Sequence, residues 1–230
     1  MEPFGRDIWT ISGDRVRMFG LLPFTTRMTV VRLESGGLWI HSPVLPTPER
    51  QDTVKALGPV EHLVAPNKIH SLGIQPWKRL CPAATVWVSP AFSQRHPDLP
   101  ADAVLSNDVD APWRSEIDLR VIDGHRVLDE VAFLHKPSGT LILTDVIQKH
   151  DAKADSWIWR RIKAMAGILG PDGGSPLDFK LSVRDRAAMR ASFQAILAWN
   201  FDKLIIAHGS CLQAGAKQEV SRVLEWITKA

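Results

Sequence analysis

Residues 130–145 read Glu-Val-Ala-Phe-Leu-His-Lys-Pro-Ser-Gly-Thr-Leu-Ile-Leu-Thr-Asp, and this stretch decides the fold. Two short apolar runs flank the turn residues Lys136-Pro-Ser-Gly139, a pattern that predicts a β-hairpin. The second run ends in Asp145. A strand that passes through a core delivers its last polar side chain to the edge of the sheet, so we expect Asp145 to lie at such an edge.

Apolar runs end in polar residues at three further places. These are Trp39-Ile-His41-Ser42, Val64-Ala-Pro-Asn67-Lys68-Ile-His70 and Ile205-Ile-Ala-His208. Imidazole and carboxylate side chains from separate strand ends form a suitable ligand set for zinc, iron or manganese. Each residue taken alone also fits a polar group that caps a strand end or bonds within a loop, so the evidence lies in their joint arrangement.

The rest of the sequence predicts strands followed by helices. We expect strands at 7–12, 28–33, 37–41, 60–65, 85–89, 117–122 and 203–207, and helices at 49–57, 70–80, 155–168, 184–199 and 213–229. Thr47 is the expected N-cap of the first helix and Ser182 that of the helix at 184–199. This order indicates an α+β protein with layered sheets and helices outside them.

These motifs, in their order and spacing, resemble the metallo-β-lactamase superfamily from about Thr29 to Ala230. Gly124-His125, the hairpin that ends in Asp145, and Ile205-Ile-Ala-His208-Gly209 match the more specific second half of the family pattern. The resemblance implies an αββα sandwich that forms a single domain over residues 1–230. It also implies hydrolysis at a metal site, although a fold alone does not establish a reaction.

The central motif departs from the family pattern. That pattern is histidine, any residue, histidine, any residue, aspartate, histidine, with a glycine shortly after. If this glycine is Gly73, the four ligand positions hold Pro66, Lys68, His70 and Ser71. The aspartate that usually ends the opening strand is replaced by His41. The chain therefore resembles a little-characterised branch of the superfamily, a domain of unknown function with a degenerate histidine motif.

The resemblance gives three alternatives for the metal content. The first family site keeps only His125, and the ammonium group of Lys68 opposes a cation there. The second site keeps His70, Asp145 and His208, a recognised ligand set for one zinc, iron or manganese ion. One metal ion, no tightly bound metal, and the usual pair of ions all stay open at this point.

Two functions of different classes follow. The first is a hydrolase in which metal-bound water attacks an ester, lactone, thioester or phosphoester, with His125 or Lys68 stabilising the developing negative charge and Asn67 orienting water or substrate. The second is a metal-free binding or structural protein on the same scaffold. Ser42 after His41 suggests a nucleophile, but no fixed spacing supports a Ser-His-Asp triad. The irregular stretches 90–114 and 170–181 are the expected substrate-contacting loops.

Composition sets the expected surroundings. The 230 residues carry a net charge of +3, and the scattered arginines argue against a nucleic-acid partner. Two cysteines give no disulfide framework, and the sequence shows neither a signal peptide nor a spanning segment, so we expect a cytoplasmic protein without a membrane partner. The expected partner is a small-molecule substrate that the sequence does not identify, and the long helices are compatible with a homodimer.

Overall fold

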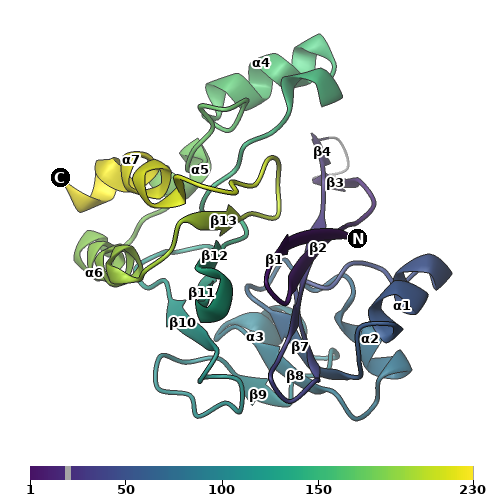
Figure 1. Ribbon diagram of the computed structural model, residues 1–230. Helices are drawn as coiled ribbons and strands as arrows, with labels where there is room; N and C mark the ends of the chain where they lie inside the picture. Colours follow the sequence, from purple (N-terminus) through teal and green to yellow (C-terminus); the bar gives the residue numbers. More distant parts are fainter. Residues whose placement is uncertain (19–21, 230) are drawn as a thin grey trace.

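The computed structural model describes residues 1–18 and 22–229, and two facing β-sheets form its centre (Figure 1). The larger sheet has seven strands in the order β1 (Glu2–Gly5), β2 (Ile8–Ser12), β5 (Arg27–Arg32), β6 (Leu38–His41), β7 (Val60–Ala65), β8 (Thr85–Val88) and β9 (Ala103–Val104). The smaller sheet has four strands in the order β10 (Ile117–Val121), β11 (Val131–His135), β12 (Thr140–Ile142) and β13 (Lys203–Ile205). Strands β3 (Val16–Met18) and β4 (Leu22–Phe24) form a separate hairpin.

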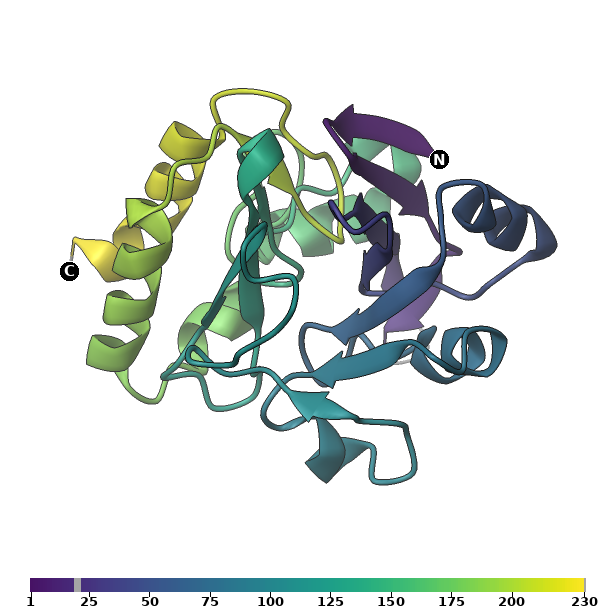
Figure 2. The ribbon, with the colours of Figure 1, turned by 60° about the horizontal axis from the view of Figure 1, so that its bottom comes forward.

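Helices cover the outer faces of both sheets (Figure 2). Those beside the larger sheet are α1 (Pro48–Lys55), α2 (Ile74–Leu80) and α3 (Phe92–Arg95), and those beside the smaller sheet are α6 (Arg186–Ala198) and α7 (Ala216–Thr228). The remaining helical segments are α4 (Trp157–Met165), α5 (Leu177–Leu181) and the 3-10 turns η1 (Lys136–Ser138) and η2 (Ala152–Ala154). The architecture is the αββα sandwich of the metallo-β-lactamase fold, as the sequence predicted.

Alternate residues of each strand in the larger sheet point to opposite faces and so belong to different core clusters. In the larger sheet, Val30, Ile40 and Leu63 are direct cross-strand partners and belong to the core cluster under α1, α2 and α3. Their chain neighbours Trp39 and Val64 instead belong to the cluster between the two sheets. Successive side chains of a strand point to opposite faces, so both faces of this sheet are apolar and buried.

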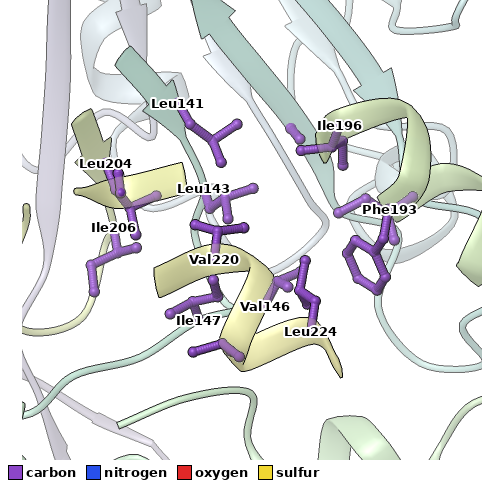
Figure 3. Packing of buried hydrophobic residues seen from close by; sticks show 14 of the residues in the cluster. Leu141, Leu143, Val146, Ile147, Phe193, Ile196, Leu204, Ile206, Val220 and Leu224 are labelled. Carbon is purple, nitrogen blue, oxygen red and sulfur yellow. The ribbon is translucent and has the colours of Figure 1, made fainter. Parts of the chain in front are cut away.

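The outer core of the smaller sheet holds the two C-terminal helices. Figure 3 shows Phe193 of α6 and Val220 and Leu224 of α7 packed with Leu141 and Leu204 of the sheet, all of them buried. Burying each such apolar side chain stabilises the fold by about 1.5–3 kcal/mol. This packing fixes β12 and β13, whose ends deliver two of the predicted ligands.

Most predicted elements form within a few residues of their expected bounds, and one cap prediction was wrong. Thr47 caps α1, since its hydroxyl accepts a hydrogen bond from the backbone N–H of Arg50 at 3.3 Å. The N-cap of α6 is Asp185 and not Ser182, because the Asp185 carboxylate accepts from the N–H of Ala188 at 3.0 Å. The Ser182 hydroxyl instead donates to the carbonyl of Asp178 at the end of α5.

None of the helices in the described part of the chain has both the length and the apolar character needed to cross a bilayer.

Candidate metal centre

Four strand ends meet at one edge of the sandwich. Strands β6 and β7 pair in parallel, as do β12 and β13, so each pair ends on the same side. The chain just beyond these ends supplies Ser42, His70, Asp145 and His208. One ligand atom from each of His70, Asp145 and His208 lies within 4.8 Å of the other two. The structure therefore brings together the three residues predicted as metal ligands.

The carboxylate of Asp145 is the centre of this group. His70 Nε2 lies 3.2 Å from its Oδ2 atom, and His208 Nε2 lies 3.1 Å from its Oδ1 atom. All three side chains are nearly buried, with about a tenth or less of their surface exposed. Burial alone would raise the pKa of Asp145, but the charges and hydrogen bonds of His70 and His208 lower it below the usual aspartate value. Asp145 is therefore ionised.

In both histidines, Nδ1 is the ring nitrogen that does not face Asp145, and it is held by a hydrogen bond. His208 Nδ1 donates to the carbonyl oxygen of Thr25 at 2.6 Å, and His70 Nδ1 bonds the hydroxyl of Ser42 at 2.6 Å. Ser42 has a φ of 53°, a left-handed conformation that a non-glycine residue adopts at a cost of about 1–2 kcal/mol. Anchored Nδ1 atoms fix the rings so that both Nε2 atoms face the carboxylate, as in metal-ligating histidines.

The two polar contacts of His208 require a proton or a metal ion between its ring and Asp145. A carbonyl oxygen only accepts, so Nδ1 of His208 carries the hydrogen of the bond to Thr25. In a neutral ring, Nε2 would then direct a lone pair at the carboxylate oxygen of Asp145 from 3.1 Å. Two lone pairs repel at that distance, so either a proton on Nε2 or a metal ion has to separate them.

The contacts are compatible with either cation. Separations of 3.1 and 3.2 Å lie within the range of N–H···O hydrogen bonds, which a proton on each Nε2 would form. Two imidazole nitrogens and a carboxylate are also ligands that zinc, iron and manganese take. The ligand set therefore suits one divalent ion held by His70, Asp145 and His208.

Asn67 holds the His70 loop against Asp145. Its amide is fully buried and donates from Nδ2 to Asp145 Oδ2 at 2.8 Å and to the hydroxyl of Thr144 at 3.0 Å. Its Oδ1 atom accepts from the backbone N–H groups of Ile69 and His70 at 2.9 and 3.0 Å. With all of these bonds satisfied inside the fold, Asn67 is placed to position His70 and Asp145.

Glu130 holds the backbone beneath Asp145. Its buried carboxylate accepts from the N–H groups of Thr144, Asp145 and Val146 at 2.7, 2.8 and 3.2 Å. Burial, followed by the negative charge of Asp145, raises the pKa of Glu130 to about 7, although the bonds from Thr144 and Asp145 favour its ionised form. Glu130 at the start of the hairpin therefore fixes the loop that carries Asp145.

A series of hydrogen-bonded, buried polar side chains continues behind His208. Gln148 Nε2 lies 3.5 Å from Asp145 Oδ1, and Gln148 Oε1 lies 3.0 Å from His150 Nε2. The other nitrogen of His150 accepts from the ammonium of Lys163 at 3.2 Å, and Lys163 pairs with Asp155 at 2.7 Å. Burial, and then the charges of Lys163 and His208, lower the pKa of His150 to about 3, so this ring is neutral.

The structure places His125 and Lys68, both predicted to act in catalysis, in different surroundings from each other. Both ring nitrogens of His125 are occupied, since Nε2 donates to the carbonyl of Phe179 at 3.1 Å and Nδ1 accepts from the N–H of Leu128 at 2.7 Å. His125 also stacks on Phe179 and does not belong to the three-residue group. In the described chain the ammonium of half-buried Lys68 makes no hydrogen bond or ion pair, which leaves it available to an anion.

Ser42, His70 and Asp145 are hydrogen-bonded in series, an arrangement that sequence spacing did not predict. The order is that of a nucleophilic serine, a base and an orienting acid. Ser42 is only 6% exposed, however, and Asp145 is shared with His208. We therefore assign the Ser42 hydroxyl to the orientation of His70.

His41, at the family's aspartate position, is buried and stacks on Trp39.

Neither of two prominent surface hollows reaches the candidate centre. One is lined by Arg6, Arg32, Glu34 and Glu116 around the turn that precedes β6, and the other lies between α1 and α2. In the stretches predicted to contact substrate, Trp113 is buried between the sheets and Phe179 under α6. These two aromatic side chains stabilise the core, and the contact of these loops with substrate stays a prediction.

Sequence reasoning missed several residues around the centre. The contact of Ser42 with His70 and that of the Thr25 carbonyl with His208 join segments 28 and 183 residues apart. Gln148 and His150 follow Asp145 closely in the sequence, and this proximity was the signal available. Their side chains gain a role only through contacts of Gln148 with Asp145 and of His150 with Lys163 and His208. Tertiary contacts of this kind leave no fixed spacing in a sequence.

Comparison with solved structures shows the same fold at low sequence identity. The DIM-1 metallo-β-lactamase is 14% identical, with a TM-score of 0.65 over 98% of this chain and 96% of that one. The metallo-β-lactamase FIM-1 from Pseudomonas aeruginosa, in its mono-zinc form, is 11% identical, with a TM-score of 0.63 over 100% and 96% of the two chains. A metallo-β-lactamase from Hirschia baltica is 12% identical, with a TM-score of 0.61 over 94% and 93%.

Comparison at the sequence level gives the family. A search of curated proteins finds no match to this sequence. A family model described as a domain of unknown function, DUF4336, matches residues 7–165, a stretch that includes His70, Asn67, Glu130 and Asp145. Because this match covers more than half of its length, the chain belongs to the DUF4336 family, and its fold is that of the metallo-β-lactamases.

Proposed function

We propose that the protein is a metal-dependent hydrolase that holds one divalent ion between His70, Asp145 and His208. The observation that carries the proposal is the orientation of the two rings, whose Nδ1 atoms are anchored while both Nε2 atoms face one carboxylate. A divalent ion satisfies that arrangement without a second proton on His208. Support also comes from FIM-1, a protein of the same fold that was crystallised with a single zinc.

The protein's own residues would do the positioning. Ser42 and the Thr25 carbonyl hold the rings, Asn67 holds the carboxylate, and Glu130 fixes the backbone beneath it. When bound, zinc, iron or manganese would act as a Lewis acid and lower the pKa of water toward about 7. The ammonium of Lys68 would stabilise negative charge that develops on the substrate. The substrate class that fits is an ester, lactone, thioester or phosphoester.

Metal analysis of purified and zinc-loaded protein tests the proposal. We expect about one equivalent in the wild type, none in His208→Ala, and an unchanged equivalent in His125→Ala, the matched histidine whose nitrogens are occupied by backbone groups. A panel of esters, lactones, thioesters and phosphoesters then tests for turnover that disappears with the metal. Two equivalents, one of them lost in His125→Ala, would show that the first family site is intact.

The alternative is a metal-free binding or structural protein on the same scaffold. The observation that favours it is that both oxygens of Asp145 already have polar partners within the protein. These partners are Asn67, Gln148 and the two histidines. A protonated His208 would complete this network without a metal. Failure of the wild type to bind zinc, iron or manganese under loading would reject the hydrolase and support this alternative.

A further inference from the structure

Helix α4 has almost no buried surface. Of its nine residues, Trp157–Met165, only Lys163 is buried. Trp157, Ile158, Ile162 and Met165 are 63%, 50%, 41% and 81% exposed. Figure 1 shows α4 at the top of the molecule, away from the two sheets. A helix with this apolar content normally buries it against the core, as α6 and α7 do.

Polar contacts fix the position of α4. The ammonium of Lys163 donates to Asp155 at 2.7 Å, to the Pro23 carbonyl at 2.8 Å and to His150 at 3.2 Å. The C-terminal end is closed by Gly167, with φ at 73°, and by a bond from the N–H of Ile168 to the carbonyl of Lys163 at 3.0 Å. The exposed apolar side chains therefore belong to an anchored helix.

The exposed side chains of α4 form an amphipathic surface. At about 100° per residue, Ile158, Ile162 and Met165 share one face, and Lys163 points away from it. Leu177, 49% exposed, continues the apolar surface, because its N–H bonds the carbonyl of Ala166 at the end of α4.

Exposed cations lie on the same segment, and Arg161 borders the apolar face. Arg160 and Arg161 of α4 and Lys153 just before it are exposed. The segment has two acidic residues, but Asp155 is buried in its pair with Lys163, and only Asp151, which caps η2, is exposed. The exposed part of the segment is therefore basic, and it is complementary to an anionic partner.

We propose that α4 docks on an anionic lipid surface, with its apolar face in the interface and Arg161, at the margin of that face, against the headgroups. A face of Ile and Met that is bordered by an Arg and followed by the exposed Trp157 suits the boundary between acyl chains and headgroups. Nine residues span about 14 Å, too short to cross a hydrocarbon core of about 30 Å, so the helix lies on the surface. A second copy packed symmetrically through this face would bring Arg161 close to its own symmetry mate.

This proposal revises the expectation of no membrane partner, which rested on the lack of a spanning segment. The sequence pattern alone could not show that the apolar face of 157–165 is exposed. The proposal does not depend on the metal or on the proposed hydrolase activity.

Sedimentation with vesicles tests the docking. The wild type is compared with Arg161→Glu/Ile162→Glu on phosphatidylcholine vesicles with and without roughly 30% phosphatidylserine. The matched control is Arg79→Glu/Leu80→Glu, which makes the same change at adjacent exposed residues of α2, at the other end of the molecule in Figure 1. We expect the wild type and the control to bind the anionic vesicles, the α4 variant to bind at least about tenfold more weakly, and added salt to weaken binding.

Three outcomes would overturn the proposal. The first is no binding of the wild type to anionic vesicles, and the second is equal loss in the α4 variant and the α2 control. The third is self-association of the wild type without vesicles that the α4 variant abolishes, which would assign the surface to a second copy. Circular dichroism of both variants checks that any loss of binding occurs in a folded protein.

Discussion

The two histidine loops of the candidate centre reach the same carboxylate but are built differently. After β13, His208 is anchored by a backbone group, the Thr25 carbonyl. After β7, His70 is anchored by the side chain of Ser42, and its loop is shaped by the side chain of Asn67. The loop that keeps the family motif thus relies on backbone, whereas the loop that has lost it relies on two specific side chains.

This difference shows how a changed motif can still deliver a ligand. Pro66 and Lys68 stand where the metallo-β-lactamase pattern predicts histidines, and buried Asn67 between them bonds both the backbone of the loop and Asp145. The loop after β7 should therefore be sensitive to side-chain substitutions at its anchors, and the loop after β13 should not be. The predictions below test that asymmetry.

Removal of the shared carboxylate should have the largest effect, because it disables both loops. In Asp145→Ala, Asn67, His70 and His208 all lose their partner in a buried site, and we expect a loss of about 3–5 kcal/mol in the free energy of unfolding together with all bound metal. Urea unfolding and metal analysis measure the two effects. The exposed Asp108→Ala is the control, and similar losses in both variants would contradict the central place of Asp145.

Substitution of Asn67 should come next and should affect only the loop after β7. Asn67→Ala leaves the backbone N–H of Ile69 without its acceptor, leaves the N–H of His70 only a 3.4 Å bond to the Asn67 carbonyl, and removes the bond to Asp145; together these losses should lower the free energy of unfolding by about 2–3 kcal/mol. Because His70 then loses its orientation, metal affinity should also fall by roughly 10–100-fold in a chelator competition. Reduced stability with unchanged affinity would limit Asn67 to capping its loop.

The sequence predicted the fold better than it predicted the anchors of the site. The alternation of Val30, Ile40 and Leu63 with Trp39 and Val64 follows from the two-residue period of strands, which any core-facing sheet imposes. Such patterns are local, so the strands and most helices could be placed from the sequence.

That His70, Asp145 and His208 lie together was also predictable, because each ends a strand or follows one closely. His125 was not: its ring is held by the carbonyl of Phe179, 54 residues away. Likewise, the pattern of 157–165 predicted a helix, but its exposure depends on the anchor that Lys163 finds in Asp155 and His150. Contacts over such separations are set by the assembled fold.

The smallest expected effect comes from a comparison of the two groups that hold the histidine rings, the Ser42 hydroxyl and the Thr25 carbonyl. Ser42→Ala and Ser42→Gly both remove the hydroxyl that orients His70, so metal affinity should fall by roughly 10–100-fold in both. Glycine accepts the φ of 53° without strain, so Ser42→Gly should have a free energy of unfolding about 1 kcal/mol above that of Ser42→Ala.

Thr25→Val is the matched change at the anchor of His208. It removes a hydroxyl that has no hydrogen-bond partner in the described structure and keeps the carbonyl that receives His208 Nδ1. Metal affinity should therefore stay close to that of the wild type. If Thr25→Val weakened metal binding as much as Ser42→Ala does, the distinction between a backbone anchor and a side-chain anchor would be wrong, and both loops would depend on their side chains alike.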